Sequence, residues 1–416
     1  MLFVLRNSWA LLLGMLLLLL GNGLQGTLLG IRGAIEGFDA ETMSLVMSAY
    51  YVGFLIGSRR ATAMIARVGH VRVFAALGSM IAAAFILYAQ APVAWVWMLL
   101  RLCVGFGFAG VYVVAESWLN NAATNETRGQ ALSLYMIVQM LGIISAQFVL
   151  NLADPAGYTL FVTMSVLVSV SFLPILLTRV TAPAFQTTKP MSLVQLYRIS
   201  PLGCVGTFLL GGVYAAIFGM GSVFGTQKGM SVAEISAFVA AIYLGGLVFQ
   251  YPIGWVSDRM DRRVLIMGLT AAGALATLVG ALFSGHYAVV LALGFVIGGV
   301  ANPLYSLIIA HTNDFLAPSD MAAASGGLLF INGTGAMIGP PVIGALMARL
   351  GANAYFAYVG VLYALIALYA LWRSTRRAAP PETSSYTPVL PQASPVALEV
   401  AQGVAIGRAG GAAGRA

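Results

Sequence analysis

Charged residues are scarce in this sequence: 8% of its 416 residues are Asp, Glu, Lys or Arg, and 60% are hydrophobic. A soluble globular domain is nearer half apolar and a quarter charged, so this composition excludes that class. Cysteine is nearly absent as well. The two cysteines, Cys103 and Cys204, lie inside apolar stretches, and two cysteines cannot form a disulfide framework or a CxxC metal site. We interpret both as small core residues.

Sequence motifs of catalysis are also missing. The chain has no Walker A loop, which excludes ATP hydrolysis by this chain, and no HExxH or GxSxG pattern. The three histidines, His70, His286 and His311, show no metal-ligand spacing. A basic face on a soluble module, which nucleic-acid binding requires, is absent too. We therefore expect no enzyme, no cofactor, no metal and no nucleic-acid partner.

Long apolar runs dominate the rest of the chain. About 20 apolar residues span a bilayer as a helix, and lipid tolerates no other spanning segment outside a closed barrel, whose strands would alternate polar and apolar residues. The first run continues to about Gly30 without an A-x-A cleavage site, so we interpret it as a retained helix. Twelve spanning helices are predicted, at 9–30, 42–63, 73–91, 93–116, 129–150, 158–178, 201–226, 234–256, 264–284, 287–310, 321–348 and 354–372.

Basic residues mark the cytoplasmic loops of a multi-pass membrane protein. If both termini are cytoplasmic, three basic residues fall in outer loops, namely Arg32, Lys228 and Arg349, and fifteen fall on the inner side. This bias predicts that orientation. The inner set is Arg6, Arg59, Arg60, Arg67, Arg72, Arg128, Arg179, Lys189, Arg198, Arg259, Arg262, Arg263, Arg373, Arg376 and Arg377.

The longest internal linker, about 179–200, is polar and separates the sixth predicted helix from the seventh. It divides the membrane part into a six-helix bundle at 1–178 and a second six-helix bundle at 201–372. Residues 373–416 are rich in Ala, Pro, Gly and Ser, and we expect them to form a disordered cytoplasmic tail.

The two bundles have the pattern of repeats. An offset of 192 or 193 residues relates similar residues over several helices, and parallel six-helix repeats with a site between them are a transporter architecture. The matched pairs are Tyr51 and Tyr243, Gly53 and Gly245, Leu55 and Leu247, Tyr112 and Tyr305, Asn120 and Asn313, and Gly142 and Gly335.

Short motifs carry a resemblance to a known family. The loop "GWVSDRMDRR" (254–263) resembles the loop signature of the major facilitator superfamily, and "TAMIARVGHVR" (62–72) resembles a degraded copy with Ala66 in place of the Asp. "RLCVGFGFAG" (101–110) resembles the helix-four motif of that family, and "GTGAMIGPPVIG" (333–344) resembles its Gly-Pro motif, here on the eleventh helix. "AESWLNNAATNETRG" (115–129) is similar to a bacterial branch of uncharacterised transporters.

The resemblance covers about 1–372 and implies an all-α, twelve-helix secondary transporter of the bacterial inner membrane. In that fold the first, fourth, seventh and tenth helices line a central cavity. The cavity residues implied are Asn22, Gln25, Arg101, Tyr112, Tyr214, Asn302 and Tyr305. Hydrogen bonding between helices is the alternative role for each. Other polar side chains within predicted helices are Gln139, Gln147, Tyr243, Gln250 and Asn332.

Arg101 is the only charged residue deep in a predicted span. Such a residue costs at least ~2.5–3.5 kcal/mol at a helix centre on insertion scales, so it should face a cavity or a partner. Glu116 lies on the same face of the helix, nearer its cytoplasmic end. We predict both as candidates for proton coupling. The alternatives are a packing role for Arg101 and, for Glu116, a pairing with Arg128 or the capping of a loop.

The charged loops predict a cytoplasmic gate. A carboxylate near a helix N-terminus is stabilised by roughly 0.3–1 kcal/mol, so we expect Asp258 to contact the start of the fifth helix near Arg128 and to latch the bundles together. In the other bundle we expect Asp320 to replace the missing acid, to cap its own helix and to attract Arg67 or Arg72. The alternative is that these charges only determine topology. The remaining predicted gate residues are Arg259, Arg262 and Arg263.

These features favour a secondary transporter that moves a small organic solute by rocking two bundles about a central site. Arg101 favours an amphipathic or anionic solute. Proton-coupled drug-type efflux is the alternative within transport, and a receptor or assembly factor that no longer transports is the alternative outside it. The expected partners are the solute, with or without a proton, and the lipid bilayer, and we expect a monomer.

Overall fold

The computed structural model describes residues 2–124, 127–177 and 191–376, and four short stretches at 386–390, 393–394, 396–398 and 400–403. This described part is helical and contains no strand. The basic residues Arg179, Lys189 and Arg377 and the greater part of the predicted linker lie outside it.

The elements are α1 (Leu2–Ile35), α2 (Ala40–Val68), α3 (His70–Gln90), α4 (Ala94–Ala122), α5 (Arg128–Val149), η1 (Leu150–Leu152), α6 (Thr159–Ser171), α7 (Leu173–Leu176), α8 (Leu193–Ile199), α9 (Pro201–Tyr214), η2 (Ala215–Met220), α10 (Gly221–Gln227), α11 (Val232–Ser257), α12 (Arg262–Phe283), α13 (Tyr287–Asn313), η3 (Pro318–Asp320), α14 (Met321–Leu350) and α15 (Ala354–Ser374).

In the described part of the chain, eleven helical segments are long and apolar enough to cross a membrane. They correspond to all the predicted spans except 42–63, which forms α2. That helix has 29 residues, but Glu41, Arg59 and Arg60 make it more polar. α2 packs against both α4 and α14. A helix that is covered by protein on two sides needs a narrower apolar face than one surrounded by lipid.

Glycines set how closely the helices cross, and they do so at equivalent positions in the two halves. A Cβ atom on Gly53 would lie 1.9 Å from the carbonyl oxygen of Leu102. A Cβ atom on Gly245, 192 residues later, would lie 1.9 Å from the carbonyl oxygen of Phe295. α2 therefore crosses α4 in the same way as α11 crosses α13. The repeat in the sequence is a repeat of helix packing.

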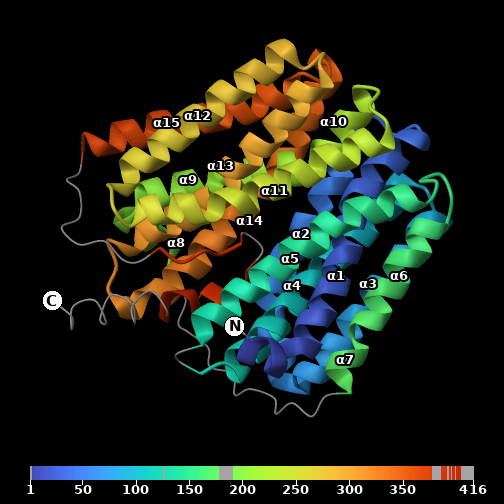
Figure 1. The fold of residues 1–416 in the computed structure, drawn as a ribbon, viewed down its shortest axis with the longest axis horizontal. Coiled ribbons are helices and arrows are strands. Elements are labelled where there is room, and N and C mark those ends of the chain that lie inside the picture. The colour runs from blue at the N-terminus through green and yellow to red at the C-terminus, as the bar shows by residue number, and fades with distance from the viewer. Residues whose placement is uncertain are drawn as a thin grey trace.

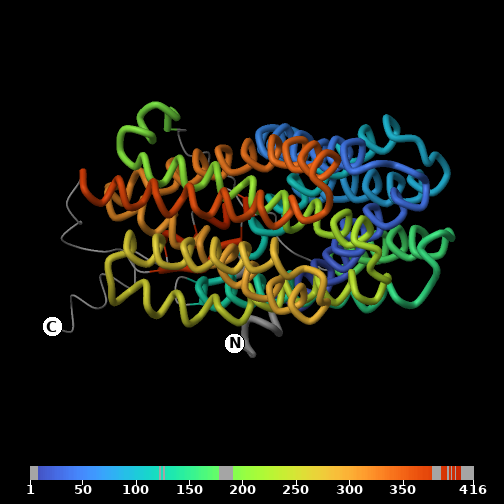
Figure 2. The backbone as a smooth tube through the Cα atoms, turned by 90° about the horizontal axis from the view of Figure 1, so that it is seen from above, coloured from blue at the N-terminus to red at the C-terminus, as the bar shows by residue number. Residues whose placement is uncertain are grey.

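The N-terminal half (α1–α7) and the C-terminal half (α9–α15) lie side by side, coloured blue to green and yellow-green to red in Figures 1 and 2. We call the end with the loops at 257–262 and 314–320 the linker end, and the end with the loops at 36–39 and 228–231 the opposite end. The halves meet through α2 against α14 and through α5 against α11. Figure 1 shows them in contact toward the opposite end and spread apart toward the linker end.

Contacts toward the opposite end explain that arrangement. Ser48 Oγ of α2 donates a hydrogen bond of 2.6 Å to the carbonyl oxygen of Met337 on α14. Further along α14, Gly344 is so close to α2 that a Cβ there would lie 2.3 Å from the side chain of Ser44. Small residues thus allow the two halves to approach closely at this end.

Part of the segment 373–416, for which the composition predicts a disordered tail, is described by the structure and is buried. α15 continues to Ser374. Beyond it, nine described residues are at most 7% exposed, and Leu398 is 1% exposed. The composition of the segment concealed this, because Tyr386, Val389, Leu390 and Leu398 are enough to bury it although Ala, Pro and Gly surround them.

Candidate functional site

Arg101 on α4 is buried, with 5% of its surface exposed, and is held by neighbours from α1 and α2. Its Nη1 donates to Gln25 Oε1 at 3.1 Å, and its guanidinium carbon lies 4.7 Å from the centre of the Tyr50 ring. The amide of Gln25 donates in turn to the hydroxyl of Tyr88 at 3.0 Å. Close helix crossing brings α2 here, because a Cβ on Gly105 would lie 2.0 Å from the carbonyl oxygen of Tyr50.

The charge of Arg101 is incompletely matched. Among the described residues, its Nε has no hydrogen-bond partner and no carboxylate forms a salt bridge with it. Its second Nη donates to the sulfur of Met47 at 3.4 Å, a weak acceptor. A guanidinium has five donors that fit carboxylate and phosphate groups. Arg101 therefore carries a buried positive charge and a donor, Nε, that no described residue pairs.

A cavity of about 40 Å³ lies between the two halves, close to this cluster. That volume holds a few water molecules, whereas binding sites for small organic molecules are several hundred Å³. The site is therefore nearly closed in this conformation. Its lining residues are Tyr50, Tyr51, Phe54, Tyr214, Phe218, Leu329, Asn332, Gly333 and Ala336.

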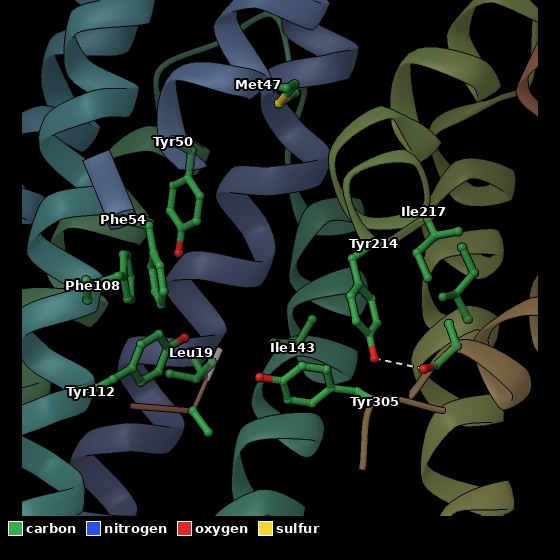
Figure 3. Close-up of a cluster of buried hydrophobic side chains, with 14 of the residues drawn as sticks. Leu19, Met47, Tyr50, Phe54, Phe108, Tyr112, Ile143, Tyr214, Ile217 and Tyr305 are labelled. Carbon is green, nitrogen blue, oxygen red and sulfur yellow. Dashed lines mark hydrogen bonds between the residues drawn. The ribbon is translucent and has the colours of Figure 1, made fainter. Parts of the chain in front are cut away.

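Aromatic rings from both halves face each other around this cavity. Figure 3 shows Tyr50, Phe54 and Tyr112 of the N-terminal half across from Tyr214 and Tyr305 of the C-terminal half. Flat apolar walls with a few polar groups are typical of sites for organic ligands.

The ring of Phe218 reaches the cavity from an irregular segment. It stacks on Tyr243 at 4.6 Å and on Tyr214 at 5.6 Å between ring centres. Phe218 belongs to η2 (Ala215–Met220), a π-helical turn between α9 and α10. Single π turns inside helices are rare and frequently occur at functional sites.

Of the seven cavity residues predicted, only Tyr214 is among those lining the cavity. Its hydroxyl donates to the carbonyl oxygen of Ala301 at 2.8 Å. Tyr305 stands edge-on to Tyr214 and is fully buried. Asn302 donates to the carbonyl oxygen of Gly298 at 3.3 Å and packs on Gly246, so it faces α11.

The other predicted cavity residues lie around Tyr50, behind the cavity wall. Arg101 and Gln25 form the cluster described above. Asn22 interacts with the hydroxyl groups of Tyr50 and Tyr112. These residues support the wall, whereas Tyr50 forms it.

Sequence reasoning missed the lining residues on α2, η2 and α14. The resemblance directed attention to the first, fourth, seventh and tenth helices, but α2 and α14 are the second and eleventh. The sequence does mark these positions, because the adjacent pair Tyr50 and Tyr51 and the amide of Asn332 are unusual in apolar helices.

Glu116 lies on α4 toward the linker end and is 2% exposed. Tyr135 donates its hydroxyl to Glu116 Oε1 at 3.3 Å, and the backbone N–H of Ser394 donates to Oε2 at 2.8 Å. Glu116 and Arg128 line the same small cavity but form no salt bridge in the described structure. The predicted alternative, a pairing of the two, is therefore not present here.

The predicted latch between Asp258 and Arg128 is not formed. Asp258 Oδ1 lies 3.5 Å from Arg262 Nη2 and accepts the N–H of Tyr386 at 2.7 Å. Because the halves are spread apart at the linker end, the loop after α11 does not reach the start of α5. Arg262 is 1% exposed and forms a buried salt bridge with Asp314.

The remaining gate residues also stay within their own half. Arg259 lies over the ring of Trp255 at 4.0 Å. Arg263 hydrogen-bonds Asp261 at 2.6 Å and lowers the pKa of that carboxyl. The second predicted contact is wrong in this conformation, because Asp320 is exposed and its side chain does not cap α14. It forms no salt bridge with Arg67 or Arg72, both of which are exposed in the described structure.

Comparison with known proteins decides the family. The model of the Major Facilitator Superfamily matches residues 11–242 and, in a second match, 202–406. The chain belongs to the Major Facilitator Superfamily. The resemblance predicted from the loop motifs is thus confirmed, and the relatives of this superfamily member are transporters, which are not enzymes.

Similar proteins agree with this. The chain is 27% identical over 372 residues to "Uncharacterized MFS-type transporter YcaD" of Escherichia fergusonii, covering 87% of this chain and 95% of that protein. It is 26% identical over 371 residues, with the same coverage, to the protein of that name in Salmonella heidelberg.

Solved structures confirm the all-α fold class with two six-helix bundles. The nucleoside transporter NupG has a TM-score of 0.74 at 16% identity, covering 88% of this chain and 98% of that chain. A bacterial homolog of the human lysosomal transporter Spinster, in an inward-facing and unoccupied conformation, has a TM-score of 0.69 at 13% identity, covering 97% of this chain and 98% of that one. Identities this low establish the fold alone.

Proposed function

We propose that this superfamily member is a secondary transporter that moves a small, anionic or amphipathic organic solute with a flat apolar part by alternating access. The main support for this proposal is the cavity between the halves, which is lined by Tyr50 and Tyr51 of α2 and, from the other half, by Tyr214 and Phe218. Because residues of both halves line the cavity, motion of one half against the other would open it to one side of the membrane or to the other. Stacking on the rings favours the flat part of the solute.

The preference for an anion rests on Arg101. Its guanidinium stacks on the ring of Tyr50, which forms the cavity wall, and its Nε has no partner among the described residues. A small rotation of the Tyr50 ring exposes the guanidinium to the cavity. Hydrogen bonds between a guanidinium and a carboxylate are stronger than those between neutral groups.

A thermal-shift screen on the purified protein tests this proposal. The probes are aromatic carboxylates and their uncharged amide analogues, measured on the wild type, Arg101→Ala and Arg59→Ala. Arg59 is the matched control because it also stacks on an aromatic ring, that of Phe330, but does not line the cavity. We expect the carboxylates to raise the Tm of the wild type and of Arg59→Ala but not of Arg101→Ala. A carboxylate that stabilises all three proteins equally would remove Arg101 from the site.

Proton coupling is the second part of the proposal, with Arg101 and Glu116 as the coupling residues. Glu116 is a buried carboxylate whose described partners, Tyr135, Ser394 and the backbone of Ala397, carry no positive charge. In proteoliposomes that contain a pH-sensitive dye, we expect solute addition to move protons with the wild type and not with Glu116→Gln. A receptor or assembly factor that does not transport would give no proton or solute movement with either protein.

We also propose that the chain is a monomer in the bacterial inner membrane with both termini in the cytoplasm, so that the linker end is the inner end. The fifteen basic residues predicted for the inner side support this orientation. A membrane-impermeant cysteine reagent on intact cells tests it: we expect labelling at Gly229→Cys and none at Gly69→Cys. The reverse pattern would overturn the orientation.

A further inference from the structure

A segment of the chain beyond α15 lies between the two halves at the linker end. Figure 1 shows the red stretch between α14 and the start of α5, on the side where the halves spread apart. Nine of its described residues are buried as deeply as core residues: Tyr386 is 5% exposed, Ala397 is 2% and Leu398 is 1%. We call the described residues within 386–403 the C-terminal plug.

The C-terminal plug contacts the N-terminal half through polar and apolar groups. The backbone N–H of Ser394 donates to Glu116 Oε2 at 2.8 Å. Leu390 packs with Met136 and Met140 of α5. A buried carboxylate that loses its donors suffers a large desolvation penalty, so the contact with Ser394 holds the plug firmly while Glu116 is ionised.

The C-terminal plug also contacts the C-terminal half. Val389 and Ser306 of α13 exchange two hydrogen bonds: the N–H of Val389 donates to Ser306 Oγ at 2.9 Å, and that hydroxyl donates to the carbonyl oxygen of Val389 at 3.0 Å. Tyr386 accepts a hydrogen bond of 2.9 Å from Gln250 and donates its N–H to Asp258 at 2.7 Å. Its ring lies against Gly254, where a Cβ would be 2.6 Å away.

These contacts join halves that must otherwise move relative to each other. Leu390 packs between Met136 of α5 and Leu247 of α11, which come from different halves. While the plug is in place, α5 and α11 cannot approach each other at the linker end, because the side chain of Leu390 already fills the space between them. The plug also occupies Glu116, Gln250 and Ser306, polar groups that would otherwise face the opening.

We propose that the C-terminal plug is an autoinhibitory element that blocks the opening at the linker end and keeps the halves apart there, and that transport requires its release. The control of transport rests on the proposed function, whereas the plug and its effect on the halves do not. Because the plug is part of the chain, its binding is intramolecular and its effective concentration near its site is high. Small changes in its contacts therefore change its occupancy.

Hydrogen exchange on the full-length protein tests whether the plug is bound. In the wild type we expect the amides of Val389 and Ser394 to exchange at least about tenfold more slowly than in a free peptide of the same sequence, because both N–H groups are hydrogen-bonded and buried. Exchange at the rate of the free peptide overturns the proposal. This measurement needs no solute, so it is independent of whether the protein transports.

Cross-linking tests whether the plug holds the halves apart. Met136→Cys and Leu247→Cys are introduced together with Cys103→Ala and Cys204→Ala, with Ala397→Glu as the release variant. The cavity beside Ala397 is about 10 Å³, which is too small for a glutamate side chain, and the carboxylate of Glu116, which also lines it, repels a second acid. The matched control is Gly403→Glu, because no atom lies within 4 Å of a Cβ at Gly403.

We expect cross-linking between positions 136 and 247 to rise at least about threefold in the release variant and to stay at the wild-type level in the control, as a shift in population requires. Should Ala397→Glu fail to fold, Ser394→Pro replaces it, since proline removes the N–H donated to Glu116. Unchanged cross-linking in a folded release variant overturns the proposal. Solute flux that is absent from every variant contradicts the proposed function and leaves this result standing.

Discussion

The N-terminal and C-terminal halves share their backbone crossings but differ in where they carry charge. Gly53 and Gly245 make the same contact in α2 and α11. Yet Arg101 on α4 corresponds to Gly294 on α13, and the buried Arg262 of the C-terminal half corresponds to His70. The repeat thus sets the backbone packing, while each half holds a different set of buried charged side chains.

The difference separates two tasks. The N-terminal half places a positive charge behind the wall of the central cavity, and the C-terminal half places its buried salt bridge, Arg262 with Asp314, at the linker end. Under the proposed function, a solute in the central cavity would therefore have a buried cation near it on one side only. The halves can move as similar rigid bodies while only one of them carries the predicted anion-binding charge.

The largest effect should come from filling the shared glycine crossings. Gly53→Val and Gly245→Val each push a side chain into a carbonyl oxygen that a Cβ would already meet at 1.9 Å. Overpacking costs about 1–3 kcal/mol and more against backbone, so we expect neither variant to be recovered as a monodisperse peak in size-exclusion chromatography. Gly268→Val, where a Cβ meets nothing within 4 Å, should behave like the wild type. Recovery of only one of the two crossing variants would show that the halves are not packed equivalently.

The next largest effect should come from the buried salt bridge that only the C-terminal half has in the described structure. Arg262→Met leaves Asp314 buried without its guanidinium, and breaking a buried pair costs about 3–5 kcal/mol. We expect a large drop in Tm for Arg262→Met and a smaller one for the equivalent change His70→Met. The double variant Arg262→Met/Asp314→Leu should regain most of the loss. No recovery in the double variant would mean that packing, not charge, sets the cost.

Equivalent tyrosines should respond with opposite sign. The hydroxyl of Tyr112 interacts with Asn22, whereas the hydroxyl of Tyr305, 193 residues later, is buried without a hydrogen-bond partner among the described residues. A typical hydrogen bond contributes about 0.5–1.5 kcal/mol, and an unpaired buried hydroxyl is itself unfavourable. We expect Tyr112→Phe to lower the Tm slightly and Tyr305→Phe to leave it unchanged or raise it. Equal losses in both variants would contradict this assignment.

The smallest effect concerns the equivalent N-caps of α2 and α11. Asp39 caps α2 by accepting the N–H of Thr42, and Ser231 caps α11. The hydrogen bond from Thr42 lowers the pKa of Asp39, so its contribution is present above the unfolded pKa and is lost as the pH falls through the folded pKa. We expect Asp39→Ser to remove this acid-dependent part, about 0.3–1 kcal/mol at most.

Thermal unfolding measured at pH 7 and at pH 3 checks this last prediction. The Tm difference between wild type and Asp39→Ser should shrink at pH 3, and Ser231→Asp should introduce a similar pH dependence in the other half. A difference that is the same at both pH values would rule out the carboxylate as its source.

The sequence was sufficient for the helices and their repeat because both depend on local properties. A bilayer requires long apolar runs, and close crossings require glycine, so the constant offset between Gly53 and Gly245 was visible without a structure. Even α2 was found, although Arg59 and Arg60 make it the most polar of the predicted spans.

The candidate site was only partly predictable because it depends on how distant helices meet. Tyr50 and Asn332 line one cavity although 282 positions separate them, and no periodicity reports such a contact. The latch at Asp258 is not formed in this conformation for a related reason: it requires the halves to be closed at the linker end, and they are spread apart there. Composition also hid the burial of Leu398, because a few apolar side chains decide it.

The π turn at Ala215–Met220 gives the seventh span an adjustable register that α1, its counterpart in the other half, lacks over its described residues. A π turn holds about one residue more than an α turn, and one residue of an α-helix corresponds to about 100° of rotation. Conversion of the π turn into an α turn would therefore rotate α10 relative to α9 by about 100°. That rotation would move the ring of Phe218 away from Tyr243. Displacement of this ring would therefore act first on one short helix, α10, and not on a whole half.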